Sequence, residues 1–358
     1  MRVYNFSAGP SALPLDVLEK VQASLCNYNG TGLSVMEMSH RSKPYEAINA
    51  RAEELLRELM GIEQDYAVIF IQGGASLQFE ALPLNICKNK KADYIVSGVF
   101  SEKAFKEAQK FTAAKAIASS KDKNFTYIPT IKKSDLTKDA DYLHICYNNT
   151  IVGTRFIELP DCGTTPLVAD FSSCILSQEL DVSKFGMIYA GAQKNLAPAG
   201  VTIVIVKKDL ALNPSPMCPT MLKWQTQIEQ NSLYNTPPAF STYVAVEVME
   251  WLKKFGGVAA MQKQNEHKAR LLYDFIDNSK FYKNNVEKKF RSLMNAVFVS
   301  PNEELDNKFV KEAANNGLIA LKGHRLVGGM RASIYNAMPV EGVQALIAFM
   351  KKFEKENS

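Results

Sequence analysis

The stretch MIYAGAQKNLAPAGVTIVIV, residues 187–206, is the segment on which the choice of fold rests. Two short apolar runs flank a loop that holds Lys194, and the glycines and prolines of this loop predict tight turns. Open α/β sheets bind ligands beyond the carboxyl ends of their strands, which is where this lysine falls. A lysine partly removed from water there would have a lowered pKa and could form a Schiff base. The alternative is a surface lysine that merely follows a strand, so Lys194 needs support from elsewhere.

Apolar runs on both sides of this stretch predict a mostly parallel sheet. Their alternation with helical stretches is typical of an α/β domain. Two helices are predicted before the sheet, one after Pro14 and one over Pro44–Met60, where apolar residues repeat at helical spacing. The predicted strands are Ala67–Ile71, Tyr94–Val96, Tyr142–Cys146, Leu167–Ala169, Met187–Ala190 and Val201–Val206.

The last third of the chain predicts a second, smaller unit. A long helical region from Phe240 to about Asn278 leads into it, and strands and helices then alternate without a run of parallel strands. We therefore expect a large α/β domain over residues 1–255, with an N-terminal arm over 1–15, and a smaller α+β domain over 256–358. The elements predicted in the smaller domain are strands near Ala296–Val299 and Met330–Tyr335, and helices over Glu303–Asn315 and from Val340.

A carboxylate supports the chemistry suggested for Lys194. Asp170 ends the apolar strand in LVADFSSCILS, at a spacing that suits two neighbouring strand ends. Such a carboxylate can keep a pyridinium nitrogen protonated, which makes the ring an effective electron sink. The alternative is that Asp170 only caps a helix that follows its strand. The pair is more specific than either residue alone.

A glycine turn supplies a third element. In FIQGGASLQFEALPLN, residues 70–85, Gly73 and Gly74 follow a strand, and a helix is predicted from about Ala75. Backbone N–H groups at a helix N-terminus bind phosphate, and Ser76 adds a hydroxyl. Many Gly-Gly turns bind nothing, but the order strand, turn and helix favours an anion site here.

Composition narrows the function classes. The chain has 358 residues, 46% of them hydrophobic, and a net charge of +5 without a basic stripe, so nucleic acid is an unpromising partner. Its six cysteines lack the spacing of a metal site and are sparse for a disulfide framework, which favours a reducing compartment. We expect no metal ion. The start of the chain lacks the apolar core of a signal peptide, and no apolar run could span a bilayer, so we expect a cytoplasmic protein.

Taken together, these residues resemble the fold-type I pyridoxal-phosphate (PLP) enzymes and, over the whole chain, the phosphoserine aminotransferase family of class V. The family's segments occur in its order. They are NFSAGPSALP at 5–14, SVMEMSHRSK at 34–43, GGASLQF at 73–79, ADFSSCILS at 169–177, YAGAQKNLAPAG at 189–200, YNTPP at 234–238 and KGHRLVGGMRASIYNAMP at 322–339.

The resemblance implies a role for each matching residue around the cofactor. Lys194 would carry PLP as a Schiff base, and Asp170 would pair with its pyridine nitrogen. Phe100 would stack on the ring and Thr150 would lie beside it. Residues expected at the cofactor phosphate are Ala75, Ser76 and Gln193, together with Asn235 and Thr236 from the second subunit of a homodimer.

The resemblance also implies the substrates. Glutamate would give its amino group to 3-phosphohydroxypyruvate, yielding 2-oxoglutarate and O-phosphoserine, with 4-phosphohydroxythreonine of pyridoxine synthesis as a possible further substrate. Arg331 would bind the α-carboxylate, with Ser7 as a weaker candidate nearby. The distal anionic group would be held by two His-Arg pairs, partly from the neighbouring subunit, because phosphate offers several acceptor oxygens. These pairs are His40-Arg41 and His324-Arg325.

Two residues depart from the pattern associated with bacterial members. Ser76 stands where some members carry arginine, which removes a charge-assisted contact to the cofactor phosphate. Phe100 stands where tryptophan is common, so the stacking surface is kept and the indole N–H is lost. Lower affinity for the cofactor is the expected consequence.

Three other functions compete. A cysteine desulfurase would need an exposed, activated thiol, and none of the six cysteines lies in a segment that suggests one. An alanine–glyoxylate aminotransferase would share the fold. A regulatory protein that binds PLP without turnover would have no use for the full set of substrate arginines.

Overall fold

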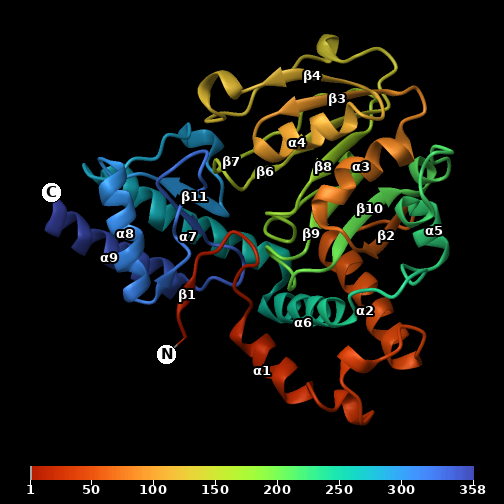
Figure 1. Ribbon diagram of the computed structural model, residues 1–358, viewed down its shortest axis with the longest axis horizontal. Helices are drawn as coiled ribbons and strands as arrows, with labels where there is room; N and C mark the ends of the chain where they lie inside the picture. The colour runs from red at the N-terminus through yellow and green to blue at the C-terminus, as the bar shows by residue number, and fades with distance from the viewer. Residues whose placement is uncertain (1) are drawn as a thin grey trace.

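A seven-stranded sheet forms the centre of the larger unit in the computed structural model, which describes residues 2–358 (Figure 1). The strand order is β2-β10-β9-β8-β5-β3-β4. Strands from β9 to β4 run parallel, as predicted, while β10 is antiparallel to both of its neighbours. The bounds are β2 Tyr66–Ile71, β3 Lys91–Val96, β4 Ala113–Ser119, β5 Tyr142–Cys146, β8 Leu167–Asp170, β9 Met187–Gly191 and β10 Thr202–Lys207.

Helices cover both faces of this sheet because alternate strand residues point to opposite sides. Ile203 and Ile205 of β10 pack in the core that includes α2 (Lys43–Met60) and α6 (Ala239–Phe255). Val204 and Val206 pack in the core that includes α3 (Gly74–Ile86). Helix α4 (Val99–Ala108) lies beside α3 on that side (Figure 1). Other elements are α1 (Leu15–Ser24), α5 (Trp224–Glu229), β6 (Asn148–Asn149) and β7 (Thr154–Arg155).

The smaller unit has its own core. Strands β11 (Asn295–Phe298) and β13 (Met330–Ser333) pair antiparallel, and α7 (Gly257–Asn278), α8 (Glu303–Asn315) and α9 (Val340–Asn357) pack around them. Near the N-terminus, β1 (Tyr4–Asn5) pairs with β12 (Leu318–Ile319), and Phe6 enters this second core. The start of the chain therefore links the smaller unit to the sheet.

Three features of the fold differ from what the sequence predicted. The helical region from residue 240 to 278 is two helices, because Gly256 and Gly257 both have left-handed backbones, with φ of 112° and 75°. Strand β4 was missed because it is a largely exposed edge strand that has no continuous apolar run. No α-helix separates β5, β8, β9 and β10 within residues 2–358.

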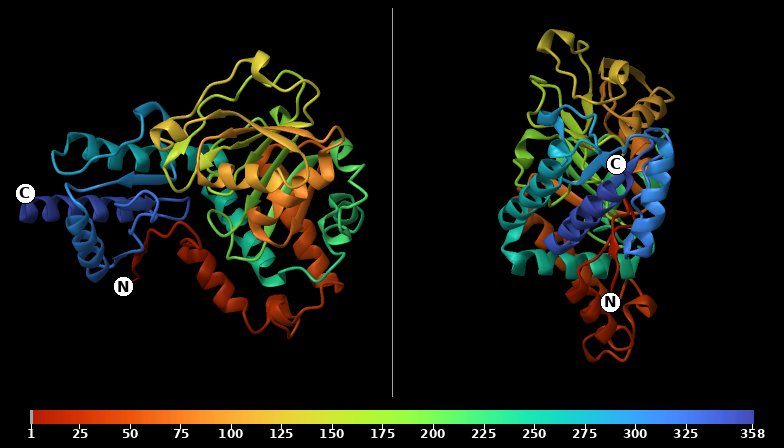
Figure 2. Two further views of the ribbon diagram at one scale, coloured as in Figure 1. Left: turned by 45° about the horizontal axis from the view of Figure 1, so that its top comes forward. Right: turned by 90° about the vertical axis from the view of Figure 1, so that its left-hand side faces the viewer.

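The segment between α1 and α2 projects from the body of the molecule, away from the C-terminal helices (Figures 1 and 2). Several large apolar side chains on it are exposed, among them Leu33 and Met36. Across residues 2–358, none of the helices combines the length and the apolar character that crossing a bilayer requires.

Candidate active site

The predicted site residues follow five strands whose carboxyl ends lie along one edge of the sheet. Because β10 is antiparallel to both β2 and β9, β2 points the same way as β3, β5, β8 and β9. The glycine turn follows β2, Phe100 follows β3, Thr150 follows β5, Asp170 ends β8, and Lys194 follows β9. The topology thus brings together residues that are far apart in the sequence, as the strand-end argument predicted.

Lys194 occupies the centre of this group. Its Nζ donates a hydrogen bond to Thr150 Oγ1 at 2.7 Å and lies 4.9 Å from the centre of the Phe100 ring. Burial lowers the pKa of Lys194, and the negative charge of Asp170 opposes that shift. Lowering the pKa favours the neutral amine, which is the nucleophilic form.

Asp170 is 5% exposed and lies on the strand next to that of Lys194. Burial raises the pKa of its carboxyl, while Lys194 and a 2.8 Å hydrogen bond from the Ser172 N–H oppose the rise. Ser172 Oγ in turn accepts the Gly191 N–H at 3.0 Å, which ties the two strand ends together. The alternative role as a helix cap is wrong, because the next helical element after β8 in the described chain is a short 3-10 turn at Val182–Lys184.

The turn after β2 has the geometry of an anion site. Gly73 and Gly74 have φ of 95° and 65°, a region that residues with a Cβ rarely adopt. Helix α3 begins at Gly74, so the N–H groups of its first turn have no acceptor within the helix. Ala75 is half-buried and Ser76 exposed at this end. The helix dipole also favours an anion here.

A close backbone contact positions Phe100. Any Cβ at Gly98 would overlap the side chain of Asn149, so only glycine lets the end of β3 approach the end of β5 this closely. The Asn149 amide holds its place by donating to Ser97 Oγ at 3.2 Å and to Thr154 Oγ1 at 3.1 Å. Sequence analysis missed Gly98 and Asn149, because the contact joins segments about fifty residues apart and leaves no local signal.

The N-terminal arm covers the stem of Lys194, which the sequence did not predict. A Cβ at Gly9 would lie 3.2 Å from Lys194 Cγ. Ser11 donates its N–H to the Gln193 carbonyl at 3.0 Å and its hydroxyl to the Lys194 carbonyl. Ser7 is half-buried on the same arm, and its Oγ accepts the Gly9 N–H at 3.3 Å. The arm therefore fixes the lysine loop and brings Ser7 near it.

Arg331, on β13, brings a cation from the smaller unit to the strand ends. Its Nη1 donates to the Thr150 carbonyl at 3.4 Å, and its Nε is buried without a hydrogen-bond partner. Burial lowers the pKa of Arg331 and of His324. The positive charges of Arg331, Arg325 and Lys103 lower the pKa of His324 further, which places these four residues in one electropositive region.

The remaining predicted residues make no hydrogen bond with Lys194 within residues 2–358. His40-Arg41 lies on the projecting segment before α2, whereas His324-Arg325 lies on the loop before β13, in a different part of the molecule (Figures 1 and 2). His40 is buried with an unpartnered Nε2, and Arg41 is exposed. Asn235 and Thr236 are exposed on the loop before α6, where the Thr236 carbonyl accepts from Gln72 Nε2 at 2.7 Å.

These residues fit PLP. Lys194 and Asp170 offer a half-buried amine and a buried carboxylate at adjacent strand ends, yet Lys194 donates to Thr150 and not to Asp170. Phe100 offers an aromatic face, and the α3 N-terminus offers free N–H groups for a phosphate. The unpartnered Nε of Arg331 needs an acceptor, which a substrate carboxylate would provide.

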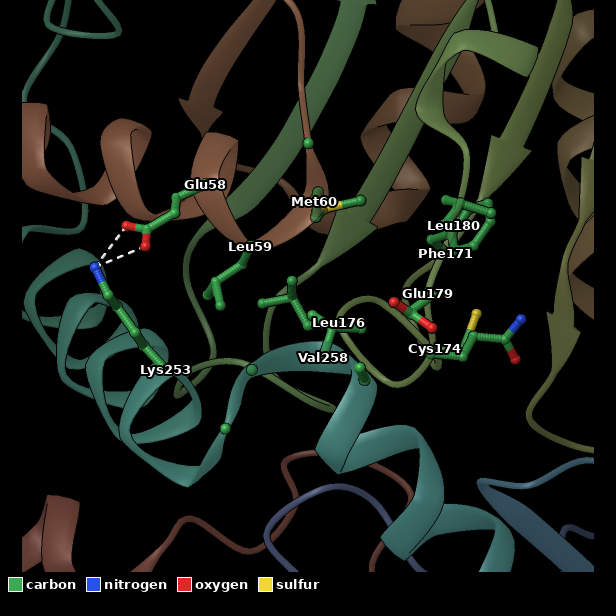
Figure 3. Close-up of a pocket in the computed structure, with 15 residues that line it drawn as sticks. Glu58, Leu59, Met60, Phe171, Cys174, Leu176, Glu179, Leu180, Lys253 and Val258 are labelled. Carbon is green, nitrogen blue, oxygen red and sulfur yellow. Dashed lines mark hydrogen bonds and ion pairs between the residues drawn. The ribbon is translucent and has the colours of Figure 1, made fainter.

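A cavity of about 540 Å³ is lined by other residues (Figure 3). It is bounded by the end of α2, the loop after β8 and the junction of α6 with α7, and includes Phe171 and Cys174. Lys253 and Glu58 on its wall pair with each other at 2.7 Å. None of the predicted site residues lines it, so its volume does not make it a rival site.

Comparison with known proteins places the chain in a family. The model of the class-V aminotransferases matches residues 3–346. A phosphoserine aminotransferase of Bacillus cereus (strain ZK / E33L) is 57% identical over 357 residues, 99% of each chain. A structure that shows radiation damage of the Schiff base in a phosphoserine aminotransferase superposes with a TM-score of 0.96, at 50% identity over 99% of both chains.

A third comparison is more distant. The crystal structure of PLP-bound phosphoserine aminotransferase from Trichomonas vaginalis has a TM-score of 0.93 to this chain, at 38% identity, and covers 98% of this chain and all of that one. The family model, the relatives and the solved structures indicate the same family over almost the whole length of the chain. The chain therefore belongs to the class-V aminotransferases and, among them, to the phosphoserine aminotransferases.

Proposed function

We propose that this protein is a PLP-dependent transaminase that moves the amino group of L-glutamate to 3-phosphohydroxypyruvate, giving O-phospho-L-serine and 2-oxoglutarate. The observation that carries the proposal is the placement of Lys194 and Asp170 at adjacent strand ends, next to a group of cations contributed by the smaller unit. Lys194 and Asp170 suit PLP chemistry, and the group of cations suits substrates that carry an anion at each end. Serine biosynthesis is the corresponding pathway.

PLP, when bound, supplies an electrophilic aldehyde and a ring that accepts electrons from the substrate's Cα. Lys194 Nζ is the group that would bond to it, and Asp170 would hold its ring nitrogen protonated. With its amine free, Lys194 would act as the general base that takes the proton from the substrate's Cα, because burial favours the neutral form of the amine. Thr150 Oγ1 holds this amine in place.

The two ends of the substrate are assigned to different cations. Arg331 binds the α-carboxylate, since its planar fork suits a carboxylate and its Nε is buried without a partner. Ser7, on the arm, is assigned to the same end. His324 and Arg325 bind the distal group, which is the side-chain carboxylate of glutamate or the phosphate of the oxo acid. Residues assigned to the cofactor phosphate are Ala75, Ser76 and Gln193.

A homodimer completes the site in this proposal. One chain carries His40-Arg41 on a projecting segment, away from its own His324-Arg325 (Figure 2). The partner subunit's Arg41 and the partner subunit's His40 would join the distal anion group, and its Asn235 and Thr236 would join the cofactor phosphate. Exposed Leu33, at 46%, and Met36, at 59%, support burial of the same segment against another subunit.

The cysteines argue against a desulfurase. Burial raises the pKa of Cys87, Cys146, Cys162, Cys174 and Cys218, which keeps these thiols protonated and weakly reactive. Cys26 is exposed, but it follows α1 and not one of the strand ends. All six thiols are free, which supports a reducing compartment such as the cytoplasm as the proposed location.

The test is a coupled assay of the purified protein with glutamate and 3-phosphohydroxypyruvate, preceded by an absorbance spectrum of the bound cofactor. We expect turnover with this pair and none when pyruvate or glyoxylate replaces the phosphorylated oxo acid. Turnover with glyoxylate, together with none with 3-phosphohydroxypyruvate, would overturn the proposal in favour of an alanine–glyoxylate type of enzyme. The same assay with the oxo acid related to 4-phosphohydroxythreonine tests the second substrate proposed from the sequence.

A further inference from the structure

One exposed lysine near the site is assigned neither to the cofactor nor to the substrate in the proposed function. Lys103 lies in the first turns of α4, and its Nζ is 5.6 Å from the centre of the Phe100 ring. Lys194 Nζ lies 4.9 Å from the centre of the same ring. A single aromatic side chain therefore has both the proposed cofactor lysine and a second amine beside it.

Lys103 makes no ion pair or side-chain hydrogen bond within residues 2–358, although an acidic residue precedes it. Glu102 pairs instead with Lys121 at 2.8 Å and with Lys106 at 3.4 Å. Both partners lower the pKa of Glu102, so its charge is already balanced. The Lys103 ammonium is left free to bind an anion from outside the chain.

The loop that holds His324 and Arg325 faces this part of α4. Val99 and Glu102 line the same cavity, of about 610 Å³, as Leu326 and Val327, which directly follow that His-Arg pair. Lys103 is also one of the charges that lower the pKa of His324, after burial, Arg331 and Arg325. Like charges gathered in this way repel one another, and a bound anion removes that cost.

We propose that Lys103 is a specificity-determining residue that binds the phosphate end of the substrate and favours it over the carboxylate end of glutamate. This inference rests on the proposed function. Phosphate carries about −1.5 to −2 charge near neutral pH, against −1 for a carboxylate, and it has three acceptor oxygens. A lysine acts on such a group as a flexible point charge. The extra cation therefore stabilises the bound phosphorylated substrate more than it stabilises bound glutamate.

The test compares two ligands on one protein. Lys103→Met removes the charge and keeps most of the stem, while Lys103→Arg keeps the charge. Lys106→Met is the matched control, since it removes a lysine from the same helix that pairs with Glu102. The holoenzyme of each variant is titrated with O-phospho-L-serine and with L-glutamate, and the change in cofactor absorbance gives a dissociation constant for each.

We expect Lys103→Met to weaken O-phosphoserine roughly tenfold, about the value of one charge-assisted hydrogen bond, and to weaken glutamate less than about threefold. Lys103→Arg should stay near wild type, and the salt dependence of O-phosphoserine binding should become shallower in Lys103→Met. Equal losses for both ligands, no loss, or the same loss in Lys106→Met would overturn the inference. A wild-type protein inactive on phosphohydroxypyruvate would instead overturn the proposed function.

Discussion

Two lysines in this protein, one buried and one half-buried, differ in what surrounds them. Lys268, on α7, is 0% exposed and donates three hydrogen bonds, to the carbonyls of Ile334, Tyr335 and Met338. Lys194 donates one, to Thr150, and lies beside an aromatic ring and a buried carboxylate. Burial lowers the pKa of both, to about 7 for Lys268.

The comparison separates a structural lysine from a reactive one. Every N–H of Lys268 has an acceptor, so its ammonium ties α7 to the link between β13 and α9 and has nothing left to offer a ligand. Lys194 keeps donors to spare at a strand end where ligands bind. A lowered pKa alone does not identify a catalytic residue. Here the unused hydrogen-bonding capacity of Lys194, at a strand end, distinguishes it from Lys268.

The largest expected effect is on catalysis. Lys194→Ala should lower kcat by roughly 10⁴-fold or more, because both the covalent attachment and the general base are lost. The free energy of unfolding should change by less than about 1 kcal/mol, since Lys194 anchors few structural contacts. Turnover and urea denaturation of the same preparation measure the loss of kcat and the unfolding free energy. A variant that keeps its activity would contradict the reactive role of Lys194.

Lys268→Met should show the opposite behaviour. The carbonyls of Ile334 and Met338 would be left buried without a donor, which costs about 2–5 kcal/mol of unfolding free energy, whereas the Tyr335 carbonyl still accepts the Met338 N–H. Below its melting temperature the variant should still bind PLP with the wild-type spectrum. Lys263→Met, at an exposed position on the same helix, is the control and should be neutral. Loss of the spectrum in a folded Lys268→Met protein would contradict the structural role.

Arg331 extends the comparison to the substrate. Arg331→Lys keeps the charge but loses the bidentate fork, so kcat/KM for glutamate should fall roughly 30- to 100-fold, equivalent to about 2–3 kcal/mol. Steady-state kinetics measure this, with Arg270→Lys on the surface of α7 as the control. An unchanged kcat/KM would show that the buried, unpartnered Nε does not face the carboxylate.

The last expected effect is on the pH dependence of stability and concerns a buried histidine. His144, on β5, stacks between Tyr94 and Tyr189, and burial lowers its pKa to about 3. The unfolded chain therefore binds more protons between pH 6.5 and 3, and stability should fall on acidification by up to about 1.4 kcal/mol per pH unit. His144→Phe should flatten that slope between pH 7 and 5 in denaturant titrations. An identical slope in both proteins would assign the acid sensitivity to other groups.

Much of the site was predictable because it depends on local signals. An apolar strand followed by a polar residue marks a strand end, and that rule placed Asp170, Lys194 and the Gly73-Gly74 turn together. The close approach of Gly98 to Asn149 was not predictable, because it depends on how two distant strands pair. Lys103 looked like any of the 42 basic residues until the fold placed it beside Phe100.

Another feature of the fold was not predicted, for a different physical reason. The break between α6 and α7 was present in the sequence as Gly256-Gly257, but apolar periodicity continues across it and favoured one helix. We propose that the large and small domains meet at this break, close to the boundary predicted after residue 255. The arm before α1 contacts both, since β1 pairs with β12 while Ser11 contacts the lysine loop.

We propose that Lys194, among all the lysines of the chain, is the one that bonds to the cofactor. Reduction of the PLP-loaded protein with borohydride, followed by proteolysis and mass spectrometry, tests it most directly, because reduction fixes the cofactor to the lysine that holds it. We expect one modified peptide, the one that contains Lys194, with Lys103 and Lys268 unmodified. A modification on another lysine, or none at all, would contradict it.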